Sequence, residues 1–475
     1  MPVHMASRPA DLIQLFPKST VLVIGEIMLD KTIIGDVNRI APEAPVPVVH
    51  VSEEQHFLGG AANVAANIAS LGGRAILCGY VGADAAADKI RSLCKEKGIT
   101  CAFSISKEPT ILKMRVTSSG QQLVRVDYEK RWAAADRHDL FDAMQPYLPD
   151  INVVVLSDYN KGMHTPELVK SALALGKPVI VDPKPENLTM FAGATIIQPN
   201  HLAAEKATGK KLDNEEAVTR VGQELSKKLG SNLLITRGAH GMSLIEKGGS
   251  VMHIPTQARE VYDVTGAGDS SIATLSLAVG AGSSLREAVI LANQTAGIKV
   301  GKRGTATVSA RELANAFESG HVKIKTAEEI QWIADELKSR GKKIVFTNGF
   351  FDVLHIGHAK LLTHAKTLGD KLVLGINTDS SIKRLKGSAR PLVPQNERGE
   401  ILSAIEAVDY IVFFDEDTPL PLIEQLRPDV IVKGGNFKPE EVVGYELLNS
   451  YGGRVEVVPL TETRNHLGVP NWIEE

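Results

Sequence analysis

A short glycine-rich stretch, VYDVTGAGDS from Val261, has the residue types that bind a transferring phosphoryl group. Gly266, Ala267 and Gly268 precede the apolar run SIATLSLAVG, so their N–H groups are expected at the start of a helix. A helix N-terminus binds anions because its first N–H groups lack acceptors and its dipole is positive there. Asp269 lies in that first turn, where it either favours the helix start or acts as a general base toward a hydroxyl. Its position next to Gly266 and Gly268 favours the role of general base.

A second stretch, FTNGFFDVLHIGHAK from Phe346, places two imidazoles where a triphosphate could bind. A strand-like segment runs into a glycine turn, and His355 and His358 flank Gly357 at the start of the next helix. A spacing of three puts both rings on one helical face, where they suit the charge that grows on phosphate oxygens during nucleotidyl transfer. The pattern lacks the glutamate of HExxH and a nearby cysteine, which disfavours zinc. The remaining alternative is two solvent-exposed histidines.

A third stretch, LGGAANVAANIASLGG, is a weaker indication of a site. Gly59 and Gly60 precede a helix of small residues, and the amide of Asn63 could face a ligand. Close helix packing is the more common reason for a Gly-Gly pair before an alanine-rich helix. The neighbouring run RIAPEAPVPVV from Arg39 predicts only an extended, proline-stiffened chain.

Alternating strand-like and helix-like runs would position these stretches. Amphipathic segments such as TPELVKSALALG and EEAVTRVGQELSKKLG separate short β-branched runs, which is typical of an α/β fold with a doubly covered parallel sheet. The predicted strands of the first half are VLVIG from Val21, INVVVLSD from Ile151, PVIVD from Pro178 and NLLITRG from Asn232.

A second α/β unit follows. TAEEIQWIADELKSRGKK from Thr326 predicts a charged helix ending at Gly341, and the later runs KLVLGINTD, YIVFFDE and VIVKGG predict strands. We place the boundary near residues 318–330. The predicted organisation is a first domain over 1–320, a linker and leading helix over 321–340, and a second domain over 341–475.

The composition bounds the class of protein. A chain of 475 residues with 43% hydrophobic and 23% charged residues predicts two or three globular domains. The net charge of -3 argues against nucleic-acid and anionic-membrane partners. The three cysteines lack metal-ligand spacing and are expected to be reduced thiols in a cytoplasmic protein: Cys78, Cys94 and Cys101. No apolar run is long enough to span a membrane, and the N-terminal segment lacks the apolar core of a signal peptide.

The segments GEIMLDKTIIGDVNRIAPEAPVPVV, GGAANVAANIASLGG and DVTGAGDS together resemble the ribokinase-like sugar kinases. The first segment is similar to the heptose 7-phosphate kinase branch, and the resemblance covers about residues 10–318. It implies a ribokinase-like α/β domain with a small β lid, ATP and Mg²⁺ at the carboxyl ends of the strands, and the sugar beneath the lid. The implied sugar contacts are Asp30, Gly59, Gly60 and Asn63, with Lys184 facing phosphate or substrate and Asn200, Gly266, Ala267 and Gly268 at the nucleotide.

Two further points concern the phosphates. Arg115 and Arg125 are candidate partners of the 7-phosphate because guanidinium groups pair bidentately with phosphate, and a surface ion pair is the alternative for each.

These kinases usually carry an Asn-x-x-Glu motif that organises the metal. Here the matching stretch is NHLA from Asn200, with Glu205 two residues later. Either Glu205 substitutes from a shifted position or the metal-bound water is held differently.

The segments FDVLHIGH, GINTDSSIKRLKG, RPLVP, AVDYIVFFDEDTP and PDVIVKGGNF resemble the HxGH nucleotidylyltransferases, which implies a smaller Rossmann-like α/β domain. The similarity covers residues 341–460 and is closest to the sugar 1-phosphate branch. It implies direct attack of a sugar phosphate oxygen on the α-phosphorus of ATP, with Mg²⁺ bridging oxygens and pyrophosphate leaving. The implied residues are Asn348, Gly349, Phe350, Lys433 and Gly434 at the nucleotide, His355, His358 and Lys360 at the reacting phosphates, and Asp379 and Lys386 at nucleotide or sugar phosphate.

The C-terminal tail departs from that family. A Ser/Thr-Thr pair followed by two isoleucines would open a last helix that meets the nucleotide phosphates. The chain instead reads TETRNHLGVP from Thr461, in which Gly468 and Pro470 disfavour a continuing helix. We therefore expect the transferase to be less efficient than the kinase.

Together the halves resemble the bifunctional heptose 7-phosphate kinase/heptose 1-phosphate adenylyltransferases. The resemblance implies two non-consecutive steps toward ADP-heptose for the lipopolysaccharide core, with a separate phosphatase acting between them, and by analogy a homo-oligomer. One alternative is the same pair of folds acting on another sugar phosphate or with CTP or GTP. Another is a non-catalytic sugar or nucleotide sensor, which the intact Asp269, His355 and His358 argue against.

Overall fold

The computed structural model describes residues 9–131, 138–256, 261–302, 304–318 and 323–459. Two compact units divide this chain, one over Pro9–Asn315 and the other from Ala316 onward. The division lies slightly before the boundary at 320 that the sequence predicts. Among the described residues, no helix is long and apolar enough to cross a membrane.

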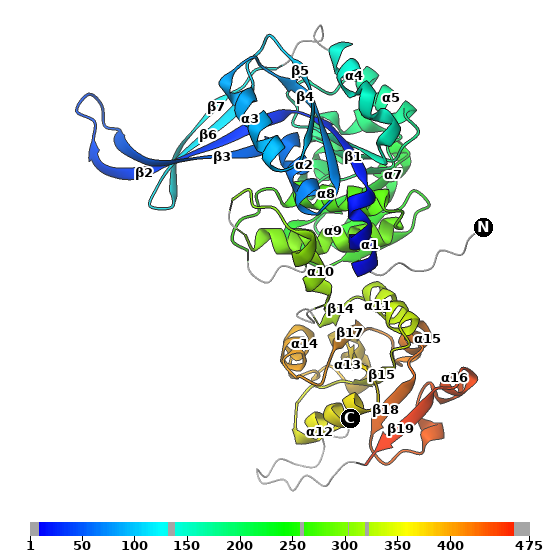
Figure 1. Cartoon of the computed structure of the whole chain (residues 1–475). Helices are drawn as coiled ribbons and strands as arrows, with labels where there is room; N and C mark the ends of the chain where they lie inside the picture. The colour runs from blue at the N-terminus through cyan, green and yellow to red at the C-terminus, as the bar shows by residue number, and fades with distance from the viewer. Residues whose placement is uncertain (1–8, 132–137, 257–260, 303, 319–322, 460–475) are drawn as a thin grey trace. The chain divides into compact units, whose positions relative to one another are not determined.

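A nine-stranded sheet forms the centre of the first unit (Figure 1). Its order is β13-β12-β11-β10-β9-β8-β1-β4-β5, and all neighbours pair in parallel except at the β11-β12-β13 edge. Strands β1 and β8 are buried along their whole length, as predicted for a sheet covered on both faces. The bounds are β1 Thr20–Gly25, β4 Arg74–Val81, β5 Thr100–Ile105, β8 Val153–Ser157, β9 Val179–Asp182, β10 Ile196–Ile197, β11 Asn232–Thr236, β12 Met242–Ile245 and β13 Val251–Ile254.

Helices cover both faces of this sheet. Helix α8 packs between α2 and α9, with α2 and α8 over β1, β4 and β8 and with α9 over β12 and β13. Helices α4, α5 and α7 contribute side chains to the core on the other face. The bounds are α1 Pro9–Leu15, α2 Ala61–Ser70, α3 Ala85–Glu96, α4 His138–Met144, α5 Pro166–Ala174, α6 His201–Thr208, α7 Glu215–Leu229, α8 Ala267–Gly280, α9 Leu285–Val300 and α10 Ala310–Glu318. The predicted α/β architecture is confirmed, whereas the antiparallel β12–β13 edge was not predicted.

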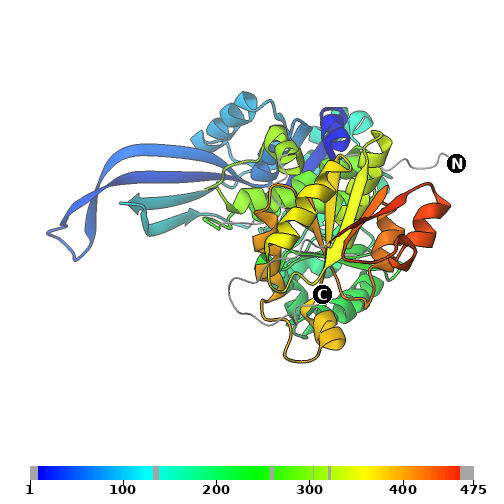
Figure 2. The same cartoon turned by 90° about the horizontal axis from the view of Figure 1, so that it is seen from below.

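A separate four-stranded sheet projects from the first unit (Figures 1 and 2). We call it the lid. Its order is β3-β2-β6-β7, with bounds β2 Ile27–Ile40, β3 Pro47–Gly60, β6 Ile111–Ser118 and β7 Gln121–Tyr128. Strand β2 follows β1 almost directly and β3 leads into α2, so the base of the lid adjoins the carboxyl ends of the main sheet.

The second unit is a parallel six-stranded sheet with helices on both faces. Its order is β14-β17-β16-β15-β18-β19. The strands are β14 Ile324–Lys325, β15 Ile344–Gly349, β16 Lys371–Asn377, β17 Tyr410–Phe414, β18 Val430–Gly434 and β19 Arg454–Val458. The helices are α11 Ala327–Ser339, α12 Ile356–Thr367, α13 Asp379–Lys386, α14 Gln395–Ser403, α15 Leu420–Leu426 and α16 Tyr445–Ser450. Segment 321–340 therefore contributes β14 and α11 to this unit.

Candidate functional site

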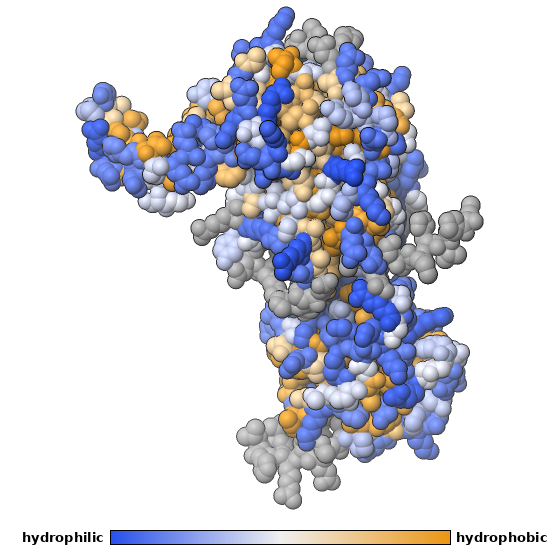
Figure 3. All heavy atoms as spheres, viewed as in Figure 1, coloured by the Kyte–Doolittle hydropathy of each residue, from blue (hydrophilic) through white to orange (hydrophobic). Residues whose placement is uncertain are grey.

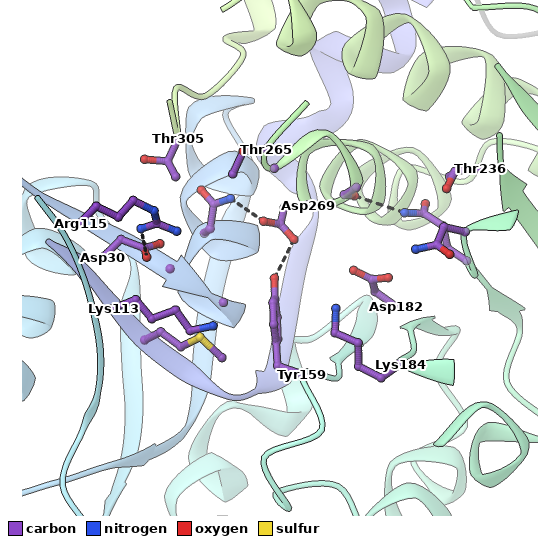
Figure 4. Close-up of a pocket in the computed structure, with 18 residues that line it drawn as sticks. Asp30, Lys113, Arg115, Tyr159, Asp182, Lys184, Thr236, Thr265, Asp269 and Thr305 are labelled. Atoms are coloured by element: carbon purple, nitrogen blue, oxygen red, sulfur yellow. Dashed lines mark hydrogen bonds and ion pairs between the residues drawn. The ribbon is translucent and has the colours of Figure 1, made fainter. Parts of the chain in front are cut away.

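A cavity of about 350 Å³ opens where the carboxyl ends of the main sheet meet the base of the lid (Figure 4). Open α/β sheets bind ligands at this edge. The structure brings most of the predicted kinase residues to this cavity, namely Asp30, Gly59, Gly60, Asn63, Arg115, Lys184, Asn200, Gly266, Gly268 and Asp269. Ala267 is the first residue of α8 beside them.

Asp269 lies near the middle of the cavity, between the Asp30–Arg115 pair and Lys184 (Figure 4). Its carboxylate accepts hydrogen bonds from Asn63 Nδ2 at 2.6 Å and from the Tyr159 hydroxyl at 2.9 Å. Burial raises the pKa of Asp269, and the two hydrogen bonds oppose that rise. A carboxylate held by two donors at a helix start can accept a proton from a bound hydroxyl.

The turn before α8 has the geometry of an anion-binding site. Gly266 is the N-cap of α8 at φ 77°, a left-handed conformation that favours glycine. The N–H groups of Gly268 and Asp269 lie in the first turn of α8 and have no acceptor within the helix. The carboxylate of Asp269 and the amides that can bind a phosphoryl group therefore come from the same helix start.

A second carboxylate, half-buried like that of Asp269, faces it across the cavity. Asp182 ends β9, and burial together with the charge of Asp269 raises its pKa to about 7, against the opposing effect of Lys184. The Lys184 ammonium lies 5.0 Å from the centre of the Tyr159 ring. Asp182 and Tyr159 were not predicted, although Asp182 is the last residue of β9 and Tyr159 lies two residues after β8, at the strand ends where ligands bind.

The lid contributes the charges at the other end of the cavity. Arg115 Nη1 donates to Asp30 Oδ1 at 2.7 Å, across the paired strands β6 and β2. A Cβ on Gly59 would lie 2.5 Å from Asp30 Oδ2, so only glycine allows this approach. Lys113 adds a second cation that the sequence analysis missed, because only strand pairing brings it opposite Asp30.

The structure does not bring Arg125 to this cavity. It lies opposite Arg115 in the β6–β7 pairing, but β7 is the edge strand of the lid. Its exposed guanidinium donates to both carboxylate oxygens of Asp127, at 3.0 and 2.9 Å. Arg125 therefore forms a surface ion pair, which was the alternative to phosphate binding in the sequence analysis.

Glu205 is also separate from the cavity. Its carboxylate accepts the N–H of Leu212 at 2.8 Å, and its side chain lines a different cavity. Asn200 caps α6 by accepting the N–H of Ala203. The shifted glutamate therefore does not reach the position where the sequence analysis considered it as a metal organiser.

In the second unit, the two histidines meet at the start of α12. His355 is the N-cap, and its ring stacks on that of His358 at 3.8 Å between centroids. Gly357 N–H donates to His355 Nδ1 at 3.1 Å, and His355 N–H donates to His358 Nδ1 at 3.3 Å. Since both Nδ1 atoms accept, the neutral rings carry their protons on Nε2, which suits donation to phosphate oxygens.

The loop between β15 and α12 also has a special backbone. Phe351 adopts φ 48°, which is uncommon for a bulky residue and is typical of constrained functional loops. Its ring contacts His358 at 5.0 Å between centroids, and both side chains are buried. The loop thus fixes the orientation of the second histidine.

A cavity of about 150 Å³ lies beside this loop and is lined by Asn348, Gly349, Phe350 and Lys433, all predicted to lie at the nucleotide. The Lys386 ammonium lies 5.5 Å from the centre of the Phe350 ring, and Gly434 ends β18 next to Lys433.

Asp379, predicted to contact nucleotide or sugar phosphate, is ion-paired with Arg398 in the structure. Its carboxylate accepts from Arg398 Nη2 at 2.7 Å, and Arg398 also donates to the carbonyls of Phe350 and Asn377. The Arg398 side chain is fully buried. Arg398 thus links Asp379 to the segment after β15 through the carbonyl of Phe350, and nothing in the local sequence predicted this role of Arg398. The altered tail from Thr461 lies outside the described residues.

Within the described chain, one group of side chains has donor atoms close enough to share a metal ion: Glu26, Asp158 and His164. The Glu26 carboxylate already accepts the N–H groups of Tyr159 and Lys161, each at 2.9 Å. The Glu26 carboxylate therefore anchors the loop after β8 that carries Tyr159 into the cavity.

Comparison with known proteins agrees with this division. Residues 18–313 match the pfkB family of carbohydrate kinases, and residues 346–458 match the cytidylyltransferase-like family. The first unit shares its fold with phosphofructokinase-2 from Escherichia coli (TM-score 0.53, 20% identity, 63% of this chain and 98% of the other). It shares the same fold with a ribokinase from Arabidopsis thaliana (TM-score 0.50, 20% identity, 63% and 98%).

Relatives span both units. The chain is 43% identical over 466 residues to the bifunctional protein HldE of Pectobacterium atrosepticum, covering 97% of each chain. It is 44% identical over 467 residues to HldE of Pseudomonas aeruginosa, covering 97% of this chain and 98% of the relative. The chain therefore belongs to the HldE family of bifunctional heptose kinases and adenylyltransferases, with a carbohydrate kinase in its first unit and a nucleotidyltransferase in its second.

Proposed function

We propose that Asp269 is the general base that activates the anomeric hydroxyl of heptose 7-phosphate. The carboxylate accepts the hydroxyl proton, and the sugar oxygen attacks the γ-phosphorus of ATP. The bond from that phosphorus to the β-phosphate oxygen breaks, and ADP leaves. The observation that carries this proposal is the position of the carboxylate in the first turn of α8, beside the N–H group of Gly268.

The lid end of the cavity would hold the sugar. Asp30 and Asn63 offer polar groups to hydroxyls, and Gly59 and Gly60 allow the sugar to approach the backbone. Arg115 is the proposed partner of the 7-phosphate. The Arg115 guanidinium uses only Nη1 in its bond to Asp30, so its other N–H groups can donate to a phosphate.

Asp182 fits the metal that an ATP-dependent kinase requires. Mg²⁺ prefers carboxylate oxygens, and a cation nearby would favour the ionised form of a carboxyl whose pKa is raised to about 7. A bound Mg²⁺ neutralises charge on the β- and γ-phosphates. Lys184 supplies a further positive charge at the same edge. With Glu205 elsewhere, we propose that Asp182 performs the role of the missing motif glutamate.

In the second unit, His355 and His358 would donate from Nε2 to the phosphates of ATP. An oxygen of heptose 1-phosphate attacks the α-phosphorus, the bond to the bridging oxygen breaks, and pyrophosphate leaves. The donors stabilise the charge that grows on the leaving oxygens. Lys433 and Phe350 would contact the nucleotide in the adjoining cavity.

The lid supports the proposal of a homo-oligomer. Large apolar side chains are exposed along its strands, and Figure 3 shows this apolar surface on the projecting arm. They include Val37, Ile40, Val51, Leu123, Val124 and Val126. Exposed apolar area of this kind is typical of protein interfaces, and a second copy of the lid would match it in chemistry. We further propose that the protein acts in the cytoplasm, where its nucleotide and sugar phosphate substrates occur.

A product assay tests the proposal. The full chain is incubated with ATP, CTP or GTP against a panel of sugar 7-phosphates and sugar 1-phosphates, and products are identified by mass spectrometry. The expected products are heptose 1,7-bisphosphate with ADP from one substrate and ADP-heptose with pyrophosphate from the other. Preference for another sugar or base would replace the substrate assignment, and nucleotide binding without any product would support a sensor.

A further inference from the structure

A buried lysine lies behind the anion-binding turn of the kinase. Lys299 belongs to the last turn of α9, and its residue is 0% exposed. Burial lowers its pKa, while the charges of Asp263 and Asp269 oppose that fall. Burying an ammonium is costly unless the charge is used or compensated. The reaction described above assigns no role to this group.

The Lys299 side chain passes directly beside the turn. A Cβ on Gly266 would lie 3.7 Å from Lys299 Cε. Lys299 Nζ donates to the carbonyl of Gly304 at 2.8 Å. Asp263 completes the link, because its carboxylate accepts the N–H of Thr265 at 2.9 Å and the N–H of Gly304 at 2.9 Å. Lys299 therefore binds the carbonyl of Gly304, and Asp263 binds its N–H group.

The residue after this anchor faces the cavity. Thr305 lines the cavity together with Thr265, and both appear on the same side of it in Figure 4. The Thr305 hydroxyl is buried and has no hydrogen-bond partner among the described residues. A buried hydroxyl without a protein partner is an unusual cost, and a ligand oxygen would satisfy it.

We propose that Lys299 is a positioning residue for phosphoryl transfer: it fixes Gly304 so that the Thr305 hydroxyl and the N–H groups beside Gly266 converge on the transferred group. Its ammonium also places a fixed positive charge behind that anion site. Such charge needs no reorganisation when negative charge builds up in the transition state. The proposal rests on the kinase reaction assigned to this cavity, and Lys299 itself does not touch the substrate.

The decisive variant is Lys299→Met, which keeps most of the side-chain volume and removes the charge and the donor. We expect kcat of the kinase to fall about tenfold or more, which is less than the roughly 10²–10³ caused by loss of a direct oxyanion donor. The KM for the sugar phosphate should stay within about twofold of wild type, because the sugar binds at the lid end. Because a partly unfolded preparation would also show a lower apparent kcat at an unchanged KM, kcat is calculated per folded protein, with the folded fraction measured by calorimetry.

Lys325→Met is the matched control. Lys325 is also buried, and burial also lowers its pKa, but it lies in β14 of the second unit. Its replacement should leave kinase kcat unchanged. Adenylyl transfer by Lys299→Met should likewise equal that of the wild type.

A double-mutant cycle with Thr305→Val separates positioning from an independent effect. If Lys299 acts through Thr305, the double variant should lose little more kcat than the more damaging single variant. Losses that multiply would overturn the proposal, as would a Lys299→Met kcat within twofold of wild type. If calorimetry shows that Lys299→Met does not fold, Lys299→Leu, which also removes the charge and the donor, is judged by the same criteria. Absence of sugar phosphorylation by the wild type would instead overturn the proposed function itself.

Discussion

Replacing Asp269 by asparagine should abolish sugar phosphorylation without unfolding the kinase. Asparagine has the shape of aspartate, and its amide can keep both neighbours: its oxygen accepts from Asn63 Nδ2, now 2.6 Å away, and its NH₂ donates to the Tyr159 oxygen, now 2.9 Å away. Burial raises the pKa of Asp269, so removing its charge relieves a desolvation cost. The free energy of unfolding should therefore change little.

The rate should change greatly, because an amide cannot accept the hydroxyl proton. Loss of a general base costs about 10²–10⁴-fold in rate. This corresponds to about 2.7–5.4 kcal/mol of transition-state stabilisation. The assay measures ADP formed from ATP and heptose 7-phosphate, with pyrophosphate release from ATP and heptose 1-phosphate as the control in the same sample. Near-normal ADP formation by Asp269→Asn would remove this residue from the mechanism, and a parallel loss of both activities would point to misfolding.

Further perturbations address the other assignments. His358→Ala should slow pyrophosphate release about 10²-fold or more while ADP formation by the kinase is unchanged; matched falls in both would contradict the separation of the sites. Arg115→Met should raise the kinase KM for the sugar 7-phosphate about tenfold, whereas the exposed Arg125→Met should leave it within about twofold; initial-rate kinetics with the reverse order would move the phosphate site to β7. Asp182→Asn should raise the Tm of the first unit more at pH 8 than at pH 5. The folded pKa of about 7 lies above the ordinary 3.8, so the wild type loses stability as pH rises through that window; a larger gain at pH 5 in calorimetry would refute the burial argument. Grafting a Ser-Thr-Thr-x-Ile-Ile tail from Thr461 onward should raise transferase activity alone, and unchanged turnover would show that the native tail suffices.

Local sequence predicted the parts of the site that one segment builds. The helix start at Gly266 and Asp269 depends on neighbouring residues, and so does the pairing of His355 with His358. Strand pairing determined the remainder. Lys113 reaches Asp30 only because β6 lies beside β2, and the lid itself was expected from resemblance and not from periodicity.

Local sequence patterns did not predict side chains whose contacts lie far away along the chain. Arg398 joins Phe350, Asn377 and Asp379 from a separate helix, and nothing in its own segment marks it as buried. Arg125 shows the converse. Its residue type suits a phosphate, but the edge position of β7 leaves it exposed beside Asp127.

The most direct test of two separate chemistries follows the wild-type chain by ³¹P NMR with ATP and heptose 7-phosphate, with and without a phosphatase that removes the 7-phosphate. The kinase alone should accumulate heptose 1,7-bisphosphate and ADP. Added phosphatase should then allow ADP-heptose and pyrophosphate to form. ADP-heptose without the phosphatase, or no bisphosphate at all, would contradict the account.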